Sequence, residues 1–224
     1  MKQSKAGKGV WVIIPAYNEQ KHIGPVVKSA KSFVDNVVVV DDGSRDKTSE
    51  VAEKSRVTVL KHVVNLGKGS ALKTGCEYAI QKGAEKIISL DADGQHKPEQ
   101  IPVFLNKLKN KDVVFGYRTF DKKMPFVFRV GNSIINYMTK LIFGIELKDT
   151  QCGYRAFRVK AYRKIKWDSN DYRMESEMVV NTARHNLRYS ELPIDTIYAD
   201  RYKGTTFIDG IKITLNLLWW KLVK

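Results

Sequence analysis

Short apolar runs alternate with segments of helical periodicity through the first half of the chain. The runs predict strands at 10–14, 37–41, 57–60, 86–90 and 112–116, and the segments between them predict helices at about 19–33, 45–54, 69–82 and 98–109. The strands are almost uniformly apolar, as in Val37-Val38-Val39-Val40, so we expect both faces of the sheet to be covered. The pattern predicts an α/β fold, a mostly parallel sheet with helices on both faces.

The alternation weakens after about residue 117. The second half predicts a loop at 118–128, helices at about 129–143 and 175–187, a mixed stretch at about 149–168, a strand near 189–194 and a helix from about 208. No repeat or linker interrupts the chain. We therefore expect a single domain over 1–224, in which about 118–224 caps the half formed by about 9–117.

Composition adds a basic character to this picture. The 224 residues are 43% hydrophobic, which suits a sizeable core, and their net charge of +15 is larger in the second half. Nucleic acid, a phosphorylated substrate and an anionic membrane surface would each suit that charge, and a basic surface that only confers solubility is the alternative.

The number of cysteines and the lengths of the apolar segments argue against disulfide-rich, zinc-binding, membrane-spanning and secreted proteins. Cys76 and Cys152 are too few for a disulfide framework and lack zinc-site spacing, so we expect two buried thiols. No stretch approaches the about 20 apolar residues of a spanning helix. The run at 10–14 stops at Pro15, so we expect no signal peptide, whose apolar region needs about 7–15 residues.

Carboxylates follow two of the predicted strands. In Asp91-Ala92-Asp93 the two acids can point the same way and converge on one hard cation, such as Mg²⁺ or Mn²⁺, although a turn that caps a helix is an equal alternative. Asp41-Asp42-Gly43-Ser44 can accept hydrogen bonds from a ribose or a base, or Asp42 or Ser44 can cap the helix near Arg45.

Weaker signals surround these acids. The segment from Pro15 to Glu19 ends the first strand and places Tyr17 to stack on a base, and His96 is the one histidine expected near the site. Gly67-Lys68-Gly69 suggests a phosphate loop, but neither GxxxxGK[ST] nor GxGxxG is present, so we do not expect one. Ligands of parallel α/β sheets bind beyond the carboxyl ends of the strands, where all these residues fall.

The combination of motifs resembles the family 2 glycosyltransferases of the GT-A fold, most of all the dolichyl-phosphate mannose and glucose synthases. The motifs are PAYNE (15–19), VVVVDDGSRDKT (37–48), NLGKGSALKTG (65–75), DADGQH (91–96), GYR (116–118) and DTQCGYR (149–155). The resemblance covers nearly the whole chain. It implies inverting transfer of a hexose from a UDP- or GDP-sugar to a polyprenyl or dolichyl phosphate.

The resemblance also assigns roles by position. Nucleotide-sugar binding is implied for Pro15, Tyr17, Glu19, Val40, Asp42, Asp91, Ala92, Asp93, Gln95, Arg118, Arg173 and Lys203. Asp93 and Gln95 match the metal ligands for Mg²⁺ or Mn²⁺. Arg118, Arg129 and Ser133 match the acceptor-phosphate site, and Asp91, Asp93 and Arg118 match the catalytic positions.

Two segments depart from the family pattern. Phe207 stands where the closing loop usually has a lysine, so its phosphate contact is lost or supplied by Lys203. The segment Asp149-Thr150-Gln151-Cys152-Gly153 is closer to the glucose-type members than to many mannose-type ones. The sequence therefore does not single out GDP-mannose as donor.

A lipid phosphate acceptor is already ionised near neutral pH, so we nominate no general base and expect arginines to hold its phosphate. Such an acceptor implies a peripheral protein on the cytoplasmic face of a membrane. Two segments fit a membrane surface. One is 120–129, with Lys122 and Lys123. The other is the C-terminal helix, whose apolar stripe is Ile208, Ile211, Leu215, Leu218 and Leu222 and whose end carries Trp219, Trp220, Lys221 and Lys224. For both segments, packing on the protein itself is an equal alternative.

Two other functions remain open. A family 2 transferase with a saccharide acceptor would need a carboxylate base, for which Asp149 and Glu175 are the candidates. A nucleic-acid-binding module would suit the basic charge, but no nucleic-acid motif is present, and the paired carboxylates would repel phosphates.

Overall fold

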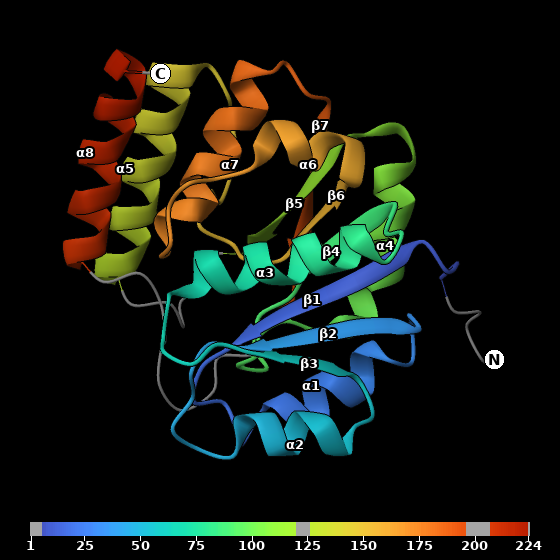
Figure 1. The fold of residues 1–224 in the computed structure, drawn as a ribbon. Coiled ribbons are helices and arrows are strands. Elements are labelled where there is room, and N and C mark those ends of the chain that lie inside the picture. The colour runs from blue at the N-terminus through green and yellow to red at the C-terminus, as the bar shows by residue number, and fades with distance from the viewer. Residues whose placement is uncertain (1–5, 120–125, 196–206, 224) are drawn as a thin grey trace.

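A single seven-stranded sheet organises the chain in the computed structural model, which describes residues 6–119, 126–195 and 207–223 (Figure 1). The strands are β1 (Val10–Ala16), β2 (Asn36–Asp41), β3 (Thr58–Lys61), β4 (Lys86–Ser89), β5 (Val113–Arg118), β6 (Arg155–Arg158) and β7 (Tyr189–Ile194). Their order is β3-β2-β1-β4-β6-β5-β7. Only β6 runs antiparallel to its neighbours β4 and β5, so the predicted mostly parallel α/β sheet is confirmed.

Helices cover both faces of the sheet. They are α1 (Ile23–Ala30), α2 (Thr48–Lys54), α3 (Lys68–Gln81), α4 (Ile101–Lys107), α5 (Phe126–Phe143), α6 (Val159–Ile165), α7 (Arg173–Arg184) and α8 (Phe207–Val223), with 3₁₀ turns at Pro98–Gln100 and Leu108–Asn110. Successive side chains of a strand point to opposite faces. Accordingly Ile14 packs with the core under α1, α2 and α4, and Ile13 packs with the core under α3, α6 and α7.

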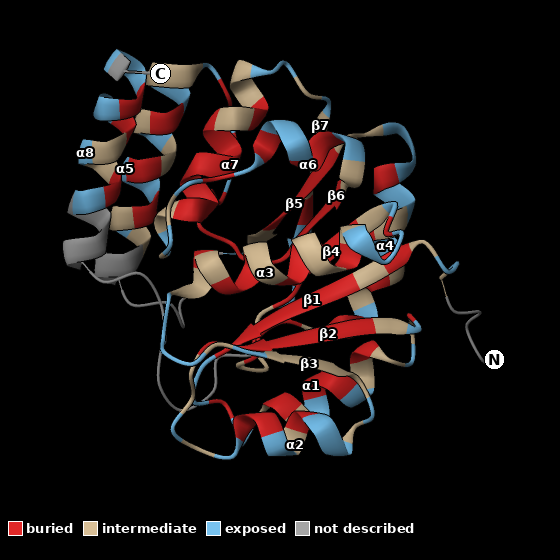
Figure 2. Cartoon of the chain, viewed as in Figure 1, coloured by how far each residue is buried: buried red, intermediate tan, exposed pale blue. Residues whose placement is uncertain are grey.

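A third, smaller core joins α5 and α8 to the rest of the domain. Ile135 on α5, Val180 on α7, and Ile213, Leu217 and Trp220 on α8 are buried together. The two outer helices run side by side at one end of the molecule, and their buried residues face inward (Figure 2). The C-terminal helix therefore does pack on the domain, through a different stripe from the predicted one.

Element boundaries differ from the predictions where side chains hold the backbone. The first helix begins at Ile23 because Glu19 N donates to Thr48 Oγ1 and Asn18 adopts a positive φ of 54°. The mixed stretch at 149–168 contains β6 and α6, which the sequence did not separate. Because β6 runs antiparallel to β4 and β5, its amino end lies beside their carboxyl ends.

Close packing of α3 on the sheet depends on Gly75. A Cβ at Gly75 would lie 2.3 Å from Ile13 Cγ2 and 3.0 Å from Val40 Cγ2. We expect Gly75→Ala to lower the free energy of unfolding by about 1–3 kcal/mol through overpacking, although alanine favours a helix. Gly131→Ala in α5, whose Cβ would meet nothing within 4 Å, should be neutral or stabilising by up to about 1 kcal/mol. Urea denaturation of both variants tests this pair; equal effects would contradict it.

Candidate functional site

A cleft of about 640 Å³ opens at the carboxyl ends of β1, β2, β4 and β5. It lies where the order of the parallel strands changes direction between β1 and β4, the usual place for a ligand in such sheets. Nine of the predicted site residues line it: Pro15, Tyr17, Glu19, Asp42, Asp91, Ala92, Asp93, Gln95 and Arg118. The cleft is also lined by His96, as expected, and by the segment Gln151-Cys152-Gly153, which precedes β6.

Other predicted site residues lie elsewhere. Val40 is not among the residues that line the cleft, since its side chain is fully buried in the core under α3, beside Gly75, and its nucleotide-sugar contact stays a prediction. Arg173 begins α7 and is held by Asp171, a cleft residue, with Arg173 Nε 2.9 Å from Asp171 Oδ1. Lys203 lies outside the described residues, as does the segment 120–125 with Lys122 and Lys123.

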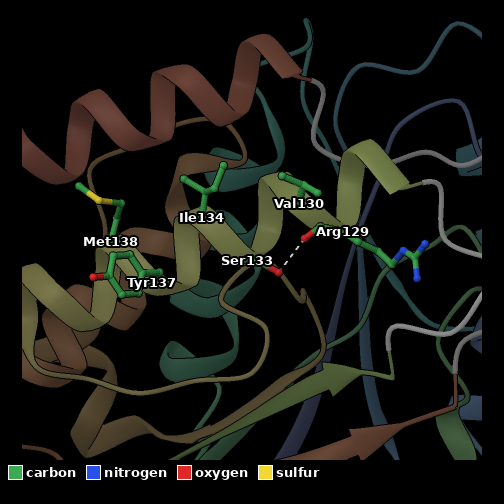
Figure 3. A pocket seen from close by; sticks show the side chains of 6 residues that line it. All are labelled: Arg129, Val130, Ser133, Ile134, Tyr137 and Met138. Atoms are coloured by element: carbon green, nitrogen blue, oxygen red, sulfur yellow. Dashed lines mark hydrogen bonds between the residues drawn. The ribbon is translucent and has the colours of Figure 1, made fainter.

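Arg129 and Ser133 line a second hollow, of about 510 Å³, on the surface of α5. The other lining residues are Val130, Ile134, Tyr137 and Met138. Ser133 Oγ donates to Arg129 O at 2.8 Å, and the Arg129 side chain reaches away from the apolar residues (Figure 3). The predicted acceptor-phosphate residues are thus divided between Arg118 in the cleft and this hollow.

Lys68 joins two acids at the floor of the cleft. Its ammonium lies 2.7 Å from Asp91 Oδ1 and 2.9 Å from Glu175 Oε1. Burial alone would lower the pKa of Lys68, but the charges of Asp91 and Glu175 outweigh it and raise that pKa. Burial likewise would raise the pKa of Asp91, yet Lys68 lowers it to about 2. Asp91 and Lys68 are therefore both charged across the physiological range.

The glycines around Lys68 serve backbone packing rather than a phosphate loop. A Cβ at Gly69 would lie 2.3 Å from Ser169 O, and Gly69 N donates to Asn170 O at 2.7 Å, so the start of α3 is occupied by another segment of the chain. Gly153 approaches side-chain ends instead of backbone, because its Cβ would lie 2.6 Å from Asp91 Oδ1 and 2.8 Å from Lys68 Nζ.

Asp42 organises the rim of the cleft. Its Oδ1 accepts from Leu66 N and pairs with His62 Nδ1, and its Oδ2 accepts from Gly67 N. The helix-capping alternative for Asp42 is wrong, because α2 begins at Thr48, whose N donates to Asp46 Oδ1.

The turn expected after β4 is present at Asp93. Its Oδ1 accepts from Gln95 N at 2.9 Å, and Gly94 adopts a φ of 74°. Burial, and then the charge of Asp91, raise the pKa of Asp93. A carboxylate in this position is stabilised by a nearby cation.

The lining of the cleft carries more negative than positive groups. Six carboxylates, those of Glu19, Asp42, Asp91, Asp93, Asp171 and Glu175, face two cations, Lys68 and Arg118. Among the described residues, no three His, Cys, Asp or Glu side chains form a complete metal cage. Mg²⁺ is commonly held by one or two protein ligands together with substrate phosphates, and Asp93 and Gln95 offer the oxygen ligands that it prefers.

Arg118 is held in a fork by Asp149. Arg118 N and Nε donate to Asp149 Oδ2 at 3.2 and 2.7 Å, and Nη2 donates to Oδ1 at 3.1 Å. Asp149 is 1% exposed and also accepts from Gln151 N. It is therefore committed to positioning Arg118, whereas Glu175, the other candidate base, does line the cleft.

Both cysteines are buried thiols, as expected. Cys152 lines the cleft, and burial raises its pKa to about 12, which keeps it a thiol at neutral pH. It therefore supplies shape rather than nucleophilic chemistry.

The neighbouring helices α5 and α8 each expose apolar side chains, which together are called the apolar helix surface. Its exposed members are Val130, Ile134, Tyr137 and Leu141 on α5 and Leu215, Leu218, Trp219 and Leu222 on α8. Lys212 and Lys221 of α8 are exposed too. In the part of the chain that the structure describes, no helix is long and apolar enough to cross a membrane.

Comparison with known proteins matches residues 11–166 to the model of glycosyl transferase family 2. A UDP-N-acetylglucosamine--dolichyl-phosphate N-acetylglucosaminyltransferase of Methanococcus voltae is 35% identical, with 98% of each chain covered. An undecaprenyl-phosphate mannosyltransferase of Micrococcus luteus is 30% identical over 90% of this chain and 88% of its own.

A solved structure shares the fold. Glucosyl-3-phosphoglycerate synthase from Mycobacterium tuberculosis, crystallised with Mn²⁺, UDP-glucose and phosphoglyceric acid, superposes with a TM-score of 0.76 at 19% identity, over 97% of this chain and 81% of its own. The predicted GT-A fold class is confirmed.

Removing the ammonium of Lys68 tests the charge cluster. We expect Lys68→Met to lower the free energy of unfolding at pH 7 by about 2 kcal/mol, because Asp91 is left without its cation. The pKa of Asp91, about 2, lies below its ordinary value, so the stabilisation is complete above pH ~4 and is lost as the pH falls through about 2. Denaturant unfolding from pH 7 to pH 2 should show the two proteins converging; a constant difference would contradict this assignment.

Proposed function

The chain belongs to glycosyl transferase family 2, and we propose that it transfers a hexose from a nucleotide-sugar to a polyprenyl phosphate with inversion of the anomeric centre. It is a glycosyltransferase, and relatives along almost its full length are named for transfer to dolichyl or undecaprenyl phosphate. The observation that carries the proposal is the arrangement of charges in the cleft, where Asp91 and Asp93 line the same cleft as a partly buried arginine that Asp149 orients.

The donor would occupy the side of the cleft formed after β1, β2 and β4. Tyr17, 41% exposed, is available to stack on a base, and Asp42 holds the rim of that side. The six carboxylates of the lining would repel a diphosphate unless a cation lay between them. Asp93 and Gln95 would hold Mg²⁺ or Mn²⁺, which when bound stabilises the charge that develops on the leaving nucleotide.

Arg118 would receive the acceptor phosphate. Its orientation by Asp149 leaves a planar guanidinium fixed at the end of β5, which suits the recognition of phosphate oxygens. Because a phosphate monoester is already ionised at neutral pH, the reaction requires positioning more than proton removal. Transfer to a saccharide is the second candidate, since Glu175 lines the cleft and would then act as the base.

We propose that the apolar helix surface of α5 and α8 rests on the cytoplasmic face of a membrane, where the lipid acceptor resides. Arg129 lies on the same helix as this surface, and exposed lysines accompany it, as anionic headgroups would require.

Asp93→Ala should reduce Mn²⁺-dependent transfer by at least about 100-fold, because the proposed metal site loses its carboxylate. The measurement is formation of lipid-linked product from a panel of UDP- and GDP-sugars with polyprenyl phosphate and Mn²⁺. Full metal-dependent transfer by the variant would disprove the metal assignment. Transfer to free saccharides but not to polyprenyl phosphate would favour the second candidate.

Substituting Leu215, Leu218 and Leu222 together by glutamine should abolish co-sedimentation with liposomes that contain anionic lipid, because about 2 kcal/mol of apolar burial is lost per leucine. The exposed face is changed while Ile213 and Leu217 keep α8 packed. Val103→Gln, at an exposed apolar position on α4, is the control and should bind as before. Undiminished binding of the triple variant would rule out this surface.

A further inference from the structure

Two buried side-chain oxygens in the cleft have neither a hydrogen-bond nor an ion-pair partner among the described residues. They are Gln151 Oε1 and Glu175 Oε2, whereas Glu175 Oε1 is paired with the ammonium of Lys68 at 2.9 Å. The two residues are 8% and 2% exposed, and both line the cleft. Folded proteins seldom leave buried acceptors unpaired, because each loses its bonds to water without replacement. A ligand that donates hydrogen bonds would satisfy both.

Both side chains are held in place by their other contacts. Gln151 Nε2 donates to Thr150 Oγ1 at 3.0 Å and to Ser176 Oγ at 2.7 Å, so the amide nitrogen is committed and the oxygen is left for a ligand. The ammonium of Lys68, 2.9 Å from Glu175 Oε1, tethers the carboxylate. The backbone of Glu175 is fixed as well, since its carbonyl accepts from Arg155 Nη1 at 2.7 Å. This part of the cleft is therefore pre-organised.

The chemistry of these oxygens selects one part of a nucleotide-sugar. Both are acceptors, and that of Glu175 belongs to an acid. Phosphate oxygens are anionic acceptors, so a diphosphate placed here would be repelled and would leave the two oxygens unpaired. The hydroxyl groups of a hexose are neutral donors and match them.

We propose that Gln151 and Glu175 form a subsite that accepts hydrogen bonds from hydroxyl groups of the donor's sugar, and that this subsite helps to determine which sugar is transferred. Lys68 is a positioning residue in this subsite, because it fixes Glu175 relative to Asp91. The inference rests on the proposed function, since it requires a nucleotide-sugar in the cleft.

The test compares the affinity for a nucleotide-sugar with the affinity for the matching nucleoside diphosphate, which lacks the sugar. Calorimetry on the full chain with Mn²⁺ would measure Kd for UDP-glucose, UDP-N-acetylglucosamine and GDP-mannose, and for UDP and GDP alone. For the nucleotide-sugar that the wild type binds most tightly, Glu175→Gln should raise Kd about tenfold, because a hydrogen bond to a charged acceptor is replaced by one to a neutral acceptor. The Kd of the matching nucleoside diphosphate should stay within about twofold.

Glu177→Gln is the matched control on the same helix. Glu177 is also buried, but its Oε2 already accepts from Asp168 N, Ser169 N and Ser169 Oγ. This variant should lower the melting temperature and leave the ratio of the two Kd values unchanged. Gln151→Met provides a second test of the subsite, with the same expected change in ratio, if Glu175→Gln does not fold.

Three results would overturn the subsite: an unchanged ratio in both variants, an equal loss of affinity for both ligands, or lost turnover with unchanged donor affinity, which would indicate a base. If the wild type binds nucleoside diphosphates but none of the nucleotide-sugars, the proposed function fails together with the subsite. If the wild type binds a nucleotide-sugar and the variants bind it equally well, only the subsite fails.

Discussion

One ammonium group balances two carboxylates beneath the cleft, and the arrangement of the site depends on it. Lys68 comes from the start of α3, Asp91 from the end of β4 and Glu175 from α7, so three separate elements meet at this charge. Partly buried charges are costly to leave alone, so each element is fixed relative to the other two. The edge of the sheet, the helix above it and the helix that leads to the outer core are thereby joined at one point.

The excess positive charge of the protein does not lie in the cleft. Although the chain carries a net charge of +15, the two permanently charged cations of the cleft lining are already paired, Lys68 with Asp91 and Glu175, and Arg118 with Asp149. The excess of positive charge therefore lies outside the cleft, where it can act on a surface rather than on a single ligand. A diphosphate in the cleft would need a metal ion for compensation, in contrast to a site lined by arginines and lysines.

Much of this arrangement could be predicted from the sequence, because parallel strands deliver the residues that follow them to a common edge. That rule predicts that Tyr17, Asp42, Asp91 and Arg118 lie at one edge of the sheet, and all four line the cleft. It failed for Gln151, because β6 is short, begins and ends with arginine, and runs against its neighbours, which no periodicity reveals. Lys68 was missed because its partners lie far away in the chain, and the pattern around it suggested a phosphate loop.

The close approach at Gly153 also limits how this scaffold can change over evolutionary time. A Cβ at this position would lie 2.6 Å from Asp91 Oδ1 and 2.8 Å from Lys68 Nζ, so any other residue here requires this ion pair to shift. A substitution of Gln151 would leave the pairing of Lys68 with Asp91 and Glu175 in place, whereas a substitution of Glu175 would remove one of its two carboxylates. The scaffold therefore tolerates a new preference at position 151 more readily than one at position 175.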